Sequence, residues 1–171
     1  MRHPDQRVGV FVDVANMYHS AKNLYGARVN FGHLLEAAVD GRKLIRACAY
    51  TIRSQSQTHE EDKFFEVLEK QGFELKMKDL QVFAGGMKKG DWDIGMAMDI
   101  IRMMTKLDVV VLATGDGDFI PLVEYIKNHG IFVEVMSFEN STSTKLTEAV
   151  DTFIDLSQNK RFYLIPIKDR K

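Results

Sequence analysis

The sequence has one cysteine, no long apolar run and almost no net charge. Cys48 is the single cysteine among 171 residues, so it cannot form an internal disulfide, and the apolar run LIRACAY favours a buried thiol over a nucleophile. Apolar runs such as VVVLA are too short to cross a bilayer, and the start MRHPDQ lacks the apolar core of a signal peptide. We therefore expect a cytoplasmic protein that does not associate with membranes.

The formal net charge of −1 excludes a surface that is basic overall. It does not exclude nucleic acid as a ligand, because a nuclease needs only a local basic rim around an acidic centre. Hydrophobic residues make up 45% and charged residues 27%, which is typical of a folded globular protein. No internal repeat, low-complexity segment or linker divides the chain. We predict one domain over residues 1–171, with its core at about 8–156 and a tail or extra strand at 157–171.

Short β-branched runs alternate with longer segments of helical period, which is the pattern of an α/β protein. It predicts a three-layer α/β/α sandwich with a mostly parallel central sheet. The expected strands are 8–14, 44–51, 73–77 with an open continuation towards 83, 109–113, 131–136 and 153–156. The expected helices are 17–25, 31–39, 58–72, 93–106, 119–129 and 143–150. The clearest helix begins with a T-x-x-E capping box at Thr58 and Glu61.

Acidic side chains follow two of the expected strands. Asp13 ends the first strand, with Asn16 three residues later, and Asp116 and Asp118 follow VVVLA in the sequence TGDGDF. In an open parallel sheet, ligands bind beyond the carboxyl ends of the strands. Carboxylates on one such rim repel one another unless a cation or shared protons offset the charge. Each residue also has a plain structural interpretation, in which Asp118 caps the helix from Phe119, Asn16 caps the first helix and Asp116 forms an Asx turn.

A further acidic group lies in KKGDWDIGMAMD, where Asp91, Asp93 and Asp99 surround the start of a helix. Asp93 and Asp99 are about 120° apart around a helix axis, so they do not point equally well at one ion. We choose Asp93 as the metal ligand. Asp99 then acts in support, behind the ligands or on a second metal, and Asp91 stays open as a replacement for Asp93.

Oxygen ligands without His or Cys suit a hard divalent cation, so the pattern favours Mg²⁺ or Mn²⁺. The five histidines show no metal-ligand spacing, which disfavours zinc. The sequence also lacks the G-x-S-x-G elbow, the Walker loop and a G-x-G-x-x-G motif after a strand. The corresponding nucleophilic and nucleotide-cofactor chemistries are therefore not supported.

Taken together, VFVDVANMYHSAK, KKGDWDIGMAMDI, LATGDGDFIPLVEYIKNHGIFVEVMSF and STKLTEAVDTFIDL resemble the NYN domain family, in its LabA-like (DUF88) branch of the PIN-like nucleases. The resemblance runs from Val8 to about Leu156. It implies a PIN-like fold and a metal-dependent ribonuclease site. The residues that it assigns to catalysis and metal binding are Asp13, Asp93, Asp116 and Asp118, with Asn16 and Asp99 in support.

One departure from the family pattern is visible. Family members usually read K-G-V-D, whereas Lys89 and Gly90 are followed here by DWD, which is one residue longer. The spacing of DIGMAMD matches the family pattern D-V-x-L-A-x-D and favours Asp93 over Asp91.

The implied reaction is hydrolysis of RNA by metal-activated water, and family analogy gives products with 5′-phosphate and 3′-hydroxyl ends. We expect Arg53, Lys88 and Lys89 to contact the RNA backbone, since rim cations supply phosphate contacts. Single-stranded RNA is preferred, because its bases can stack on aromatics such as Tyr18 or Trp92. The sequence leaves a homodimer open.

Two other functions compete with this one. The first is a non-catalytic module that binds RNA, a nucleotide or a protein, and the near-neutral charge keeps it in contention. The second is a haloacid-dehalogenase-like phosphatase, suggested by Asp13 and by GDGD. That chemistry needs an aspartate two residues after the nucleophile, and residue 15 is alanine, so we rank it last.

Overall fold

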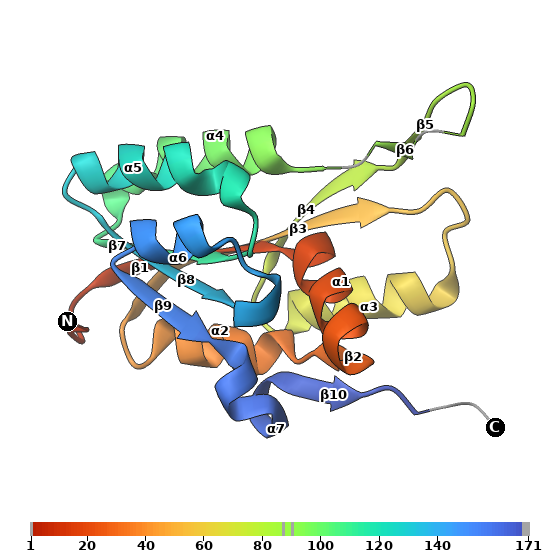
Figure 1. Cartoon of the computed structure of the whole chain (residues 1–171), viewed down its shortest axis with the longest axis horizontal. Helices are drawn as coiled ribbons and strands as arrows, with labels where there is room; N and C mark the ends of the chain where they lie inside the picture. The colour runs from red at the N-terminus through yellow and green to blue at the C-terminus, as the bar shows by residue number, and fades with distance from the viewer. Residues whose placement is uncertain (1, 87, 90, 169–171) are drawn as a thin grey trace.

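The computed structural model describes residues 2–86, 88–89 and 91–168, with Lys88 and Lys89 described as backbone only. Its centre is a six-stranded sheet in the order β4-β3-β1-β7-β8-β9, in which every neighbouring pair is parallel (Figure 1). The strands are β1 (Arg7–Asp13), β3 (Lys43–Arg53), β4 (Glu74–Asp79), β7 (Val109–Ala113), β8 (Phe132–Ser137) and β9 (Thr152–Asp155). All six therefore present their carboxyl ends at one edge.

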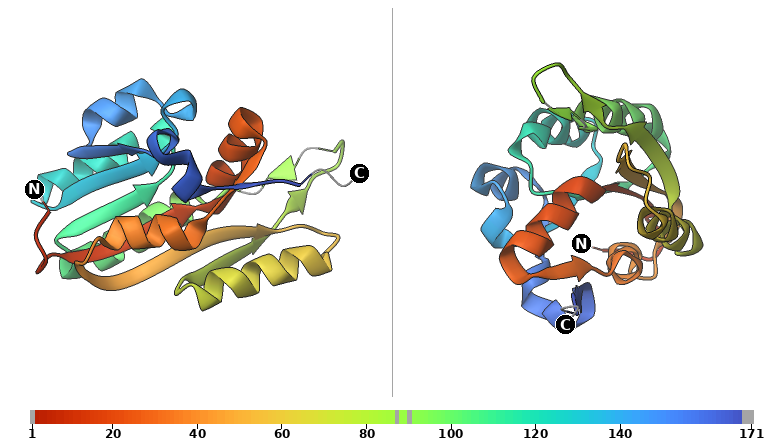
Figure 2. Two further views of the ribbon diagram at one scale, coloured as in Figure 1. Left: turned by 90° about the horizontal axis from the view of Figure 1, so that it is seen from below. Right: turned by 90° about the vertical axis from the view of Figure 1, so that its right-hand side faces the viewer.

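Helices cover both faces of this sheet (Figures 1 and 2). One apolar cluster joins the sheet to α1 (Val14–Tyr25), α2 (Phe31–Val39) and α3 (His59–Lys70). A second cluster joins the other face to α4 (Asp93–Met103), α5 (Ile120–Asn128) and α6 (Thr144–Ala149). Short 3₁₀ turns are η1 (Met104–Lys106), η2 (Gly117–Phe119), η3 (Glu139–Ser141) and η4 (Leu156–Asn159). The predicted three-layer α/β/α architecture with a parallel sheet is confirmed.

Two small antiparallel sheets add to the sandwich. After α7 (Lys160–Tyr163), strand β10 (Leu164–Pro166) pairs with β2 (Ala27–Val29), so the segment after residue 156 supplies both a helix and a strand. The third predicted strand does not continue to residue 83. Strand β4 ends at Asp79, and β5 (Gln81–Val82) pairs with β6 (Lys88–Lys89) in a separate hairpin that projects from the body (Figures 1 and 2).

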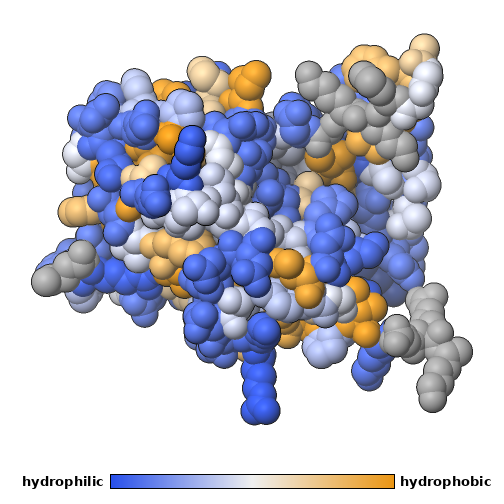
Figure 3. All heavy atoms as spheres, in the orientation of Figure 1, coloured by the Kyte–Doolittle hydropathy of each residue, from blue (hydrophilic) through white to orange (hydrophobic). Residues whose placement is uncertain are grey.

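The strand pattern explains why the core has two halves. Along β1, Val8, Val10 and Val12 enter the cluster under α1 to α3, whereas Phe11 enters the cluster under α4 to α6, as strand alternation requires. Every residue of β7 is buried. The face drawn in Figure 3 is hydrophilic over most of its area and is hollowed next to the β5–β6 hairpin. In the part of the chain that the structure describes, no helix has the length and apolar character to cross a membrane.

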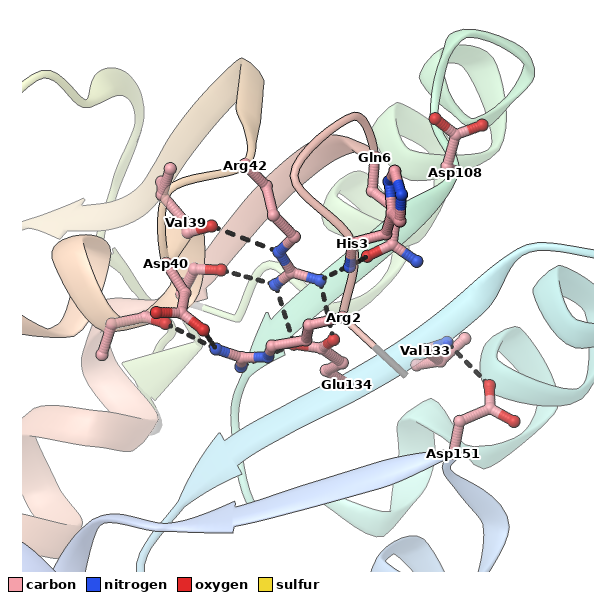
Figure 4. A network of polar contacts seen from close by, with 12 residues as sticks. Arg2, His3, Gln6, Val39, Asp40, Arg42, Asp108, Val133, Glu134 and Asp151 are labelled. Carbon is pink, nitrogen blue, oxygen red and sulfur yellow. Dashed lines mark hydrogen bonds and ion pairs between the residues drawn. The ribbon is translucent and has the colours of Figure 1, made fainter.

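A buried ion-pair network joins elements near the amino ends of the strands (Figure 4). The guanidinium of Arg42 donates to both carboxylate oxygens of Glu134, at 2.9 and 3.0 Å, and to the carbonyls of Ala38 and Val39. The Arg42 and Glu134 side chains are only 1% and 6% exposed. Arg2 adds a second guanidinium to Glu134, at 2.8 Å. The buried carboxylate is thus compensated by two cations, which fastens the amino-terminal segment and α2 to β8.

Breaking this network should destabilise the protein. Glu134→Gln removes the charge that two guanidinium groups share, and we expect the free energy of unfolding to fall by about 3 kcal/mol, because a buried cation is left without its counter-ion. Urea unfolding followed by circular dichroism measures the change. Asp5→Asn is the control, since the Asp5 side chain is 74% exposed in its pair with Lys43 and should matter little. Equal stability of the two variants would contradict this role for Glu134.

Candidate metal centre

Three of the predicted aspartates converge at the carboxyl edge of the sheet. Asp116 and Asp118 follow β7, and Asp93 is the first residue of α4. Each offers a carboxylate oxygen, and these three oxygens lie within 4.8 Å of one another. Oxygen ligands on opposite sides of one divalent cation are about 4 to 5 Å apart. The three-carboxylate group therefore has the size and the hard-oxygen chemistry of a site for Mg²⁺, Mn²⁺ or Ca²⁺.

Asp13, which was also expected to be a metal ligand, is not among the three carboxylates of this group, and it is half-buried at the end of β1. Its Oδ1 accepts a hydrogen bond from the backbone N–H of Asn16 at 3.2 Å, which caps α1. Burial raises the pKa of Asp13 to about 6, and the charges of Asp116 and Asp91 also raise it, against the lowering effect of the Asn16 hydrogen bond. Because the charge of Asp116 contributes to the pKa of Asp13, Asp13 is close enough to the three-carboxylate group to interact with it electrostatically.

Asp93 has the same kind of shift. Burial is the largest cause that raises its pKa to about 6, followed by the charges of Asp116, Asp13, Asp91 and Asp118. The carboxylates thus repel one another, and the ionised forms are costly in the metal-free protein. A divalent cation at this point would offset the repulsion.

The turn after β7 confirms the expected Asx turn of Asp116 and contradicts the expected cap by Asp118. Asp116, and not Asp118, is the cap: its Oδ1 accepts from the backbone N–H of Asp118 at 2.9 Å, which forms the Asx turn and begins η2. The expected Asp118 cap of a helix from Phe119 is wrong, because the helical turn already starts at Gly117 and α5 has no side-chain cap. The exposed carboxylate of Asp118 therefore has no capping role to compete with a cation.

Asn16 connects the two acidic segments. The backbone N–H of Asn16 donates to Oδ1 of Asp13, which caps α1. The side-chain Oδ1 of Asn16 accepts a hydrogen bond from the backbone N–H of Gly115 at 3.0 Å. The expected cap by the Asn16 side chain is wrong, since Asp13 performs that role. Instead, Asn16 fixes the start of α1 against the turn that carries Asp116.

Ser143 packs tightly against the same turn. A Cβ added to Gly117 would lie 2.8 Å from the Ser143 hydroxyl oxygen, so only glycine fits between them. The backbone N–H of Ser143 also donates to the carbonyl of Gly115 at 3.0 Å. No local pattern indicates this contact of Ser143, because Gly117 lies 26 positions away along the chain.

The DWD insertion brings in a further acidic residue. Asp91 is exposed, and its charge raises the pKa values of both Asp13 and Asp93. Among the described residues, however, the three-carboxylate group contains Asp93 and not Asp91. The indole N–H of Trp92 donates to the Thr51 carbonyl at 2.7 Å, which anchors the chain between Asp91 and Asp93. The geometry thus favours Asp93 as the ligand.

Asp99 lies outside the three-carboxylate group. Its carboxylate accepts from the buried Tyr50 hydroxyl at 2.9 Å and pairs with Lys76 at 4.0 Å and Arg102 at 3.6 Å. These partners lie on β3, on β4 and on α4 itself. Asp99 therefore anchors α4 to the sheet, and the structure does not place it beside the metal ligands.

The predicted RNA contacts are only partly described. Arg53 ends β3, and its buried Nε has no hydrogen-bond partner in the described structure. The side chains of Lys88 and Lys89 lie outside the described residues. Trp92 is anchored by its indole N–H, whereas Tyr18 is 38% exposed on α1 and accessible to a base.

The raised pKa values make the stability of the metal-free protein depend on pH. Between the ordinary value of 3.8 and about 6, the folded state holds more protons on Asp13 and Asp93 than the unfolded state does. The free energy of unfolding therefore falls as the pH rises through this interval. Asp93→Asn removes one titrating group and should make this fall smaller, as measured by thermal unfolding in EDTA at a series of pH values. Curves that stay parallel for the two proteins would contradict the assignment.

Two aspartates on one helix give a test of the metal site. Millimolar Mn²⁺ should raise the melting temperature of the unsubstituted protein by linkage, and Asp93→Asn should lose most of that shift. Asp99→Asn should keep it, because asparagine still accepts the Tyr50 hydrogen bond. Differential scanning fluorimetry measures both. A shift that survives Asp93→Asn and disappears with Asp99→Asn would place the ion elsewhere on α4.

Comparison with known proteins supports the architecture. A crystal structure of a protein of unknown function from Vibrio parahaemolyticus superposes with a TM-score of 0.86 at 28% identity, covering 96% of this chain and 99% of that one. The low amplitude and bright protein LabA of Synechococcus elongatus is 24% identical over 162 residues, or 91% of this chain and 87% of LabA. An uncharacterized protein of Methanocaldococcus jannaschii is 24% identical over 159 residues, and the match spans 58% of its length.

The sequence model of the NYN domain family matches residues 7–157 of this chain. This range contains the three-carboxylate group, Asp13 and Asn16. NYN domains form part of the PIN-like nuclease superfamily, whose fold typically uses divalent metals. Since the match spans most of the sequence, the chain belongs to the NYN domain family.

Proposed function

We propose that the protein is a Mg²⁺- or Mn²⁺-dependent ribonuclease that hydrolyses phosphodiester bonds of RNA. The observation that carries the proposal is the convergence of Asp93, Asp116 and Asp118 within 4.8 Å, on an NYN domain. Asp13 adds a fourth carboxylate whose pKa the others influence. Such a set of oxygen ligands, open to solvent at Asp118, is suited to a cation that keeps water and substrate in its shell.

Each side chain has a distinct part in this proposal. Asp93, Asp116 and Asp118 would hold the ion, which when bound activates a water molecule and stabilises charge on the phosphate. Asp13 would contribute a half-buried carboxylate of raised pKa that can accept a proton from this water. Asn16 holds the turn of Asp116 in register with Asp13, and Asp99 holds α4 to the sheet. Asn16 and Asp99 thus act indirectly, because each holds a segment that carries proposed metal ligands in position.

Single-stranded RNA is the substrate that we infer. Arg53 is a cation at the carboxyl edge with an unpartnered buried Nε, and the chain adds Lys88 and Lys89 in β6. Tyr18 offers an exposed ring near the start of α1 for stacking with a base. Family analogy gives 5′-phosphate and 3′-hydroxyl ends. A cytoplasmic location and a homodimer stay predictions.

The second candidate is a regulatory module that binds RNA, a nucleotide or a protein without cleaving it. The formal net charge of −1 keeps this candidate open, because a module that binds a protein or a nucleotide needs no basic surface overall. Membership of the NYN family gives the phosphatase interpretation no support.

RNA cleavage tests the proposal directly. We expect the protein to cleave labelled single-stranded RNA in Mn²⁺, to lose cleavage in EDTA, and to lose it in the double variant Asp13→Asn/Asp116→Asn. Asp116→Asn removes a proposed metal ligand, and Asp13→Asn removes the neighbouring half-buried carboxylate. Gel electrophoresis of the products measures the rate. Asp99→Asn, which removes an acidic charge outside the three-carboxylate group, is the matched control and should retain cleavage.

Cleavage that persists in EDTA or in the double variant would rule out this site. Saturable binding of RNA without any cleavage in Mn²⁺ would favour the regulatory module. The double variant must also unfold at a temperature close to that of the unsubstituted protein, so that lost cleavage reports on chemistry.

A further inference from the structure

Lys78 differs from the other cations on its face of the sheet edge. Three of them are neutralised: Arg46 and Lys76 pair with Glu74, and Arg102 pairs with Asp99. Lys78, at the carboxyl end of β4, is exposed and has no carboxylate partner among the residues that the structure describes. Its charge is therefore available to an external anion.

The ammonium of Lys78 is nevertheless held in place. It donates to the carbonyl oxygen of Asp91 at 3.0 Å and lies 4.7 Å from the centre of the Trp92 ring, within cation–π range. An ammonium group has three N–H donors, and a carbonyl and a ring face leave at least one of them free. The charge is fixed in position while a donor stays open.

The support under Lys78 is rigid. The Trp92 indole N–H donates to the Thr51 carbonyl at 2.7 Å, and its ring packs edge-on against Tyr50 at a centroid distance of 5.3 Å. A Cβ added to Gly95 would lie 2.7 Å from the same indole, so the ring rests directly on the first turn of α4. Lys78 is thereby fixed relative to the helix that begins with Asp93.

This position is beside the candidate metal centre. Lys78 donates to the backbone carbonyl of Asp91, which lies two residues before Asp93 at the start of α4. Strand register places Lys78 beside Ile52 on β3, two residues after Tyr50, whose side chain packs into the cluster under α4 to α6. Lys78 thus lies on the same face of the sheet as the helix that carries Asp93.

We propose that Lys78 binds a phosphate group of the RNA strand next to the phosphate that is cleaved. The proposal rests on the ribonuclease function proposed above. The metal neutralises the carboxylates, whereas Lys78 supplies positive charge that no carboxylate of the described chain uses. A cation fixed on an aromatic ring beside the metal site holds the neighbouring phosphate, and so sets where the strand lies relative to the ion.

Binding of a short single-stranded RNA in EDTA, measured by fluorescence anisotropy at several salt concentrations, tests the proposal. Each lost phosphate contact should reduce the slope of log affinity against log salt by about 0.7 for a single strand. We expect Lys78→Met and Lys78→Gln to bind more weakly and with that smaller slope. Lys78→Arg should keep the slope of the unsubstituted protein. Lys76→Met is the matched control on the same strand and face, and should leave affinity and slope unchanged.

Two further readouts separate a phosphate contact from a structural role. Lys78→Gln can still donate to the Asp91 carbonyl, so its melting temperature and its stabilisation by Mn²⁺ should match those of the unsubstituted protein. In cleavage assays, it should raise KM more than it lowers kcat.

Each outcome decides between the proposals. Unchanged affinity and slope in both neutral variants would overturn the Lys78 contact and leave the ribonuclease function standing. A reduced slope, in a protein that binds RNA but never cleaves it, would support the contact and overturn the ribonuclease. An equal loss in Lys76→Met would reduce Lys78 to general surface charge and overturn its specific role. Failure of the unsubstituted protein to bind RNA in EDTA would overturn the Lys78 contact, and the cleavage assay in Mn²⁺ decides separately on the ribonuclease.

Discussion

Mutual repulsion among carboxylates at one edge of the sheet is the constraint on which the site depends. Asp13, Asp93, Asp116 and Asp118 come from three separate segments, and nothing in their own chemistry would keep them together. The buried strands β1 and β7 fix two of these segments side by side, and the Asn16 hydrogen bond to Gly115 ties their ends. Trp92 and the Tyr50–Asp99 hydrogen bond fix α4 against the same sheet. Apolar packing thus stabilises a group that electrostatics alone would disperse.

The sequence predicted the features that depend on local pattern. Alternating apolar strands and capped helices indicated the α/β/α architecture, and parallel strands necessarily bring Asp13 and Asp116 to one edge. Asp93 also followed from the spacing of its helix. The three-carboxylate group therefore consists of residues that the sequence pattern indicates. Strand β2 was missed because a three-residue strand has too few positions for an alternating pattern.

The remaining details depend on contacts that no local pattern contains. Asp116, and not Asp118, is the cap because a 3₁₀ turn begins two residues before the expected start of the helix. Asp99 became an anchor because Tyr50, 49 positions away, offers it a hydroxyl group. From the sequence alone, Lys78 cannot be distinguished from any other lysine of an edge strand. Its significance came from the lack of a carboxylate partner and from the Trp92 ring beneath it.

The Arg42–Glu134 network gives the sheet two electrostatically different ends. Near the amino ends of the strands, a buried carboxylate is satisfied by two guanidinium groups of the chain itself, so folding alone completes the charge balance there. At the carboxyl ends, the described chain supplies carboxylates without matching cations inside the group, and in the function proposed above a bound cation completes the balance. In that proposal, folding and cation binding depend on opposite ends of one sheet, so removal of the cation leaves the Arg42–Glu134 network in place.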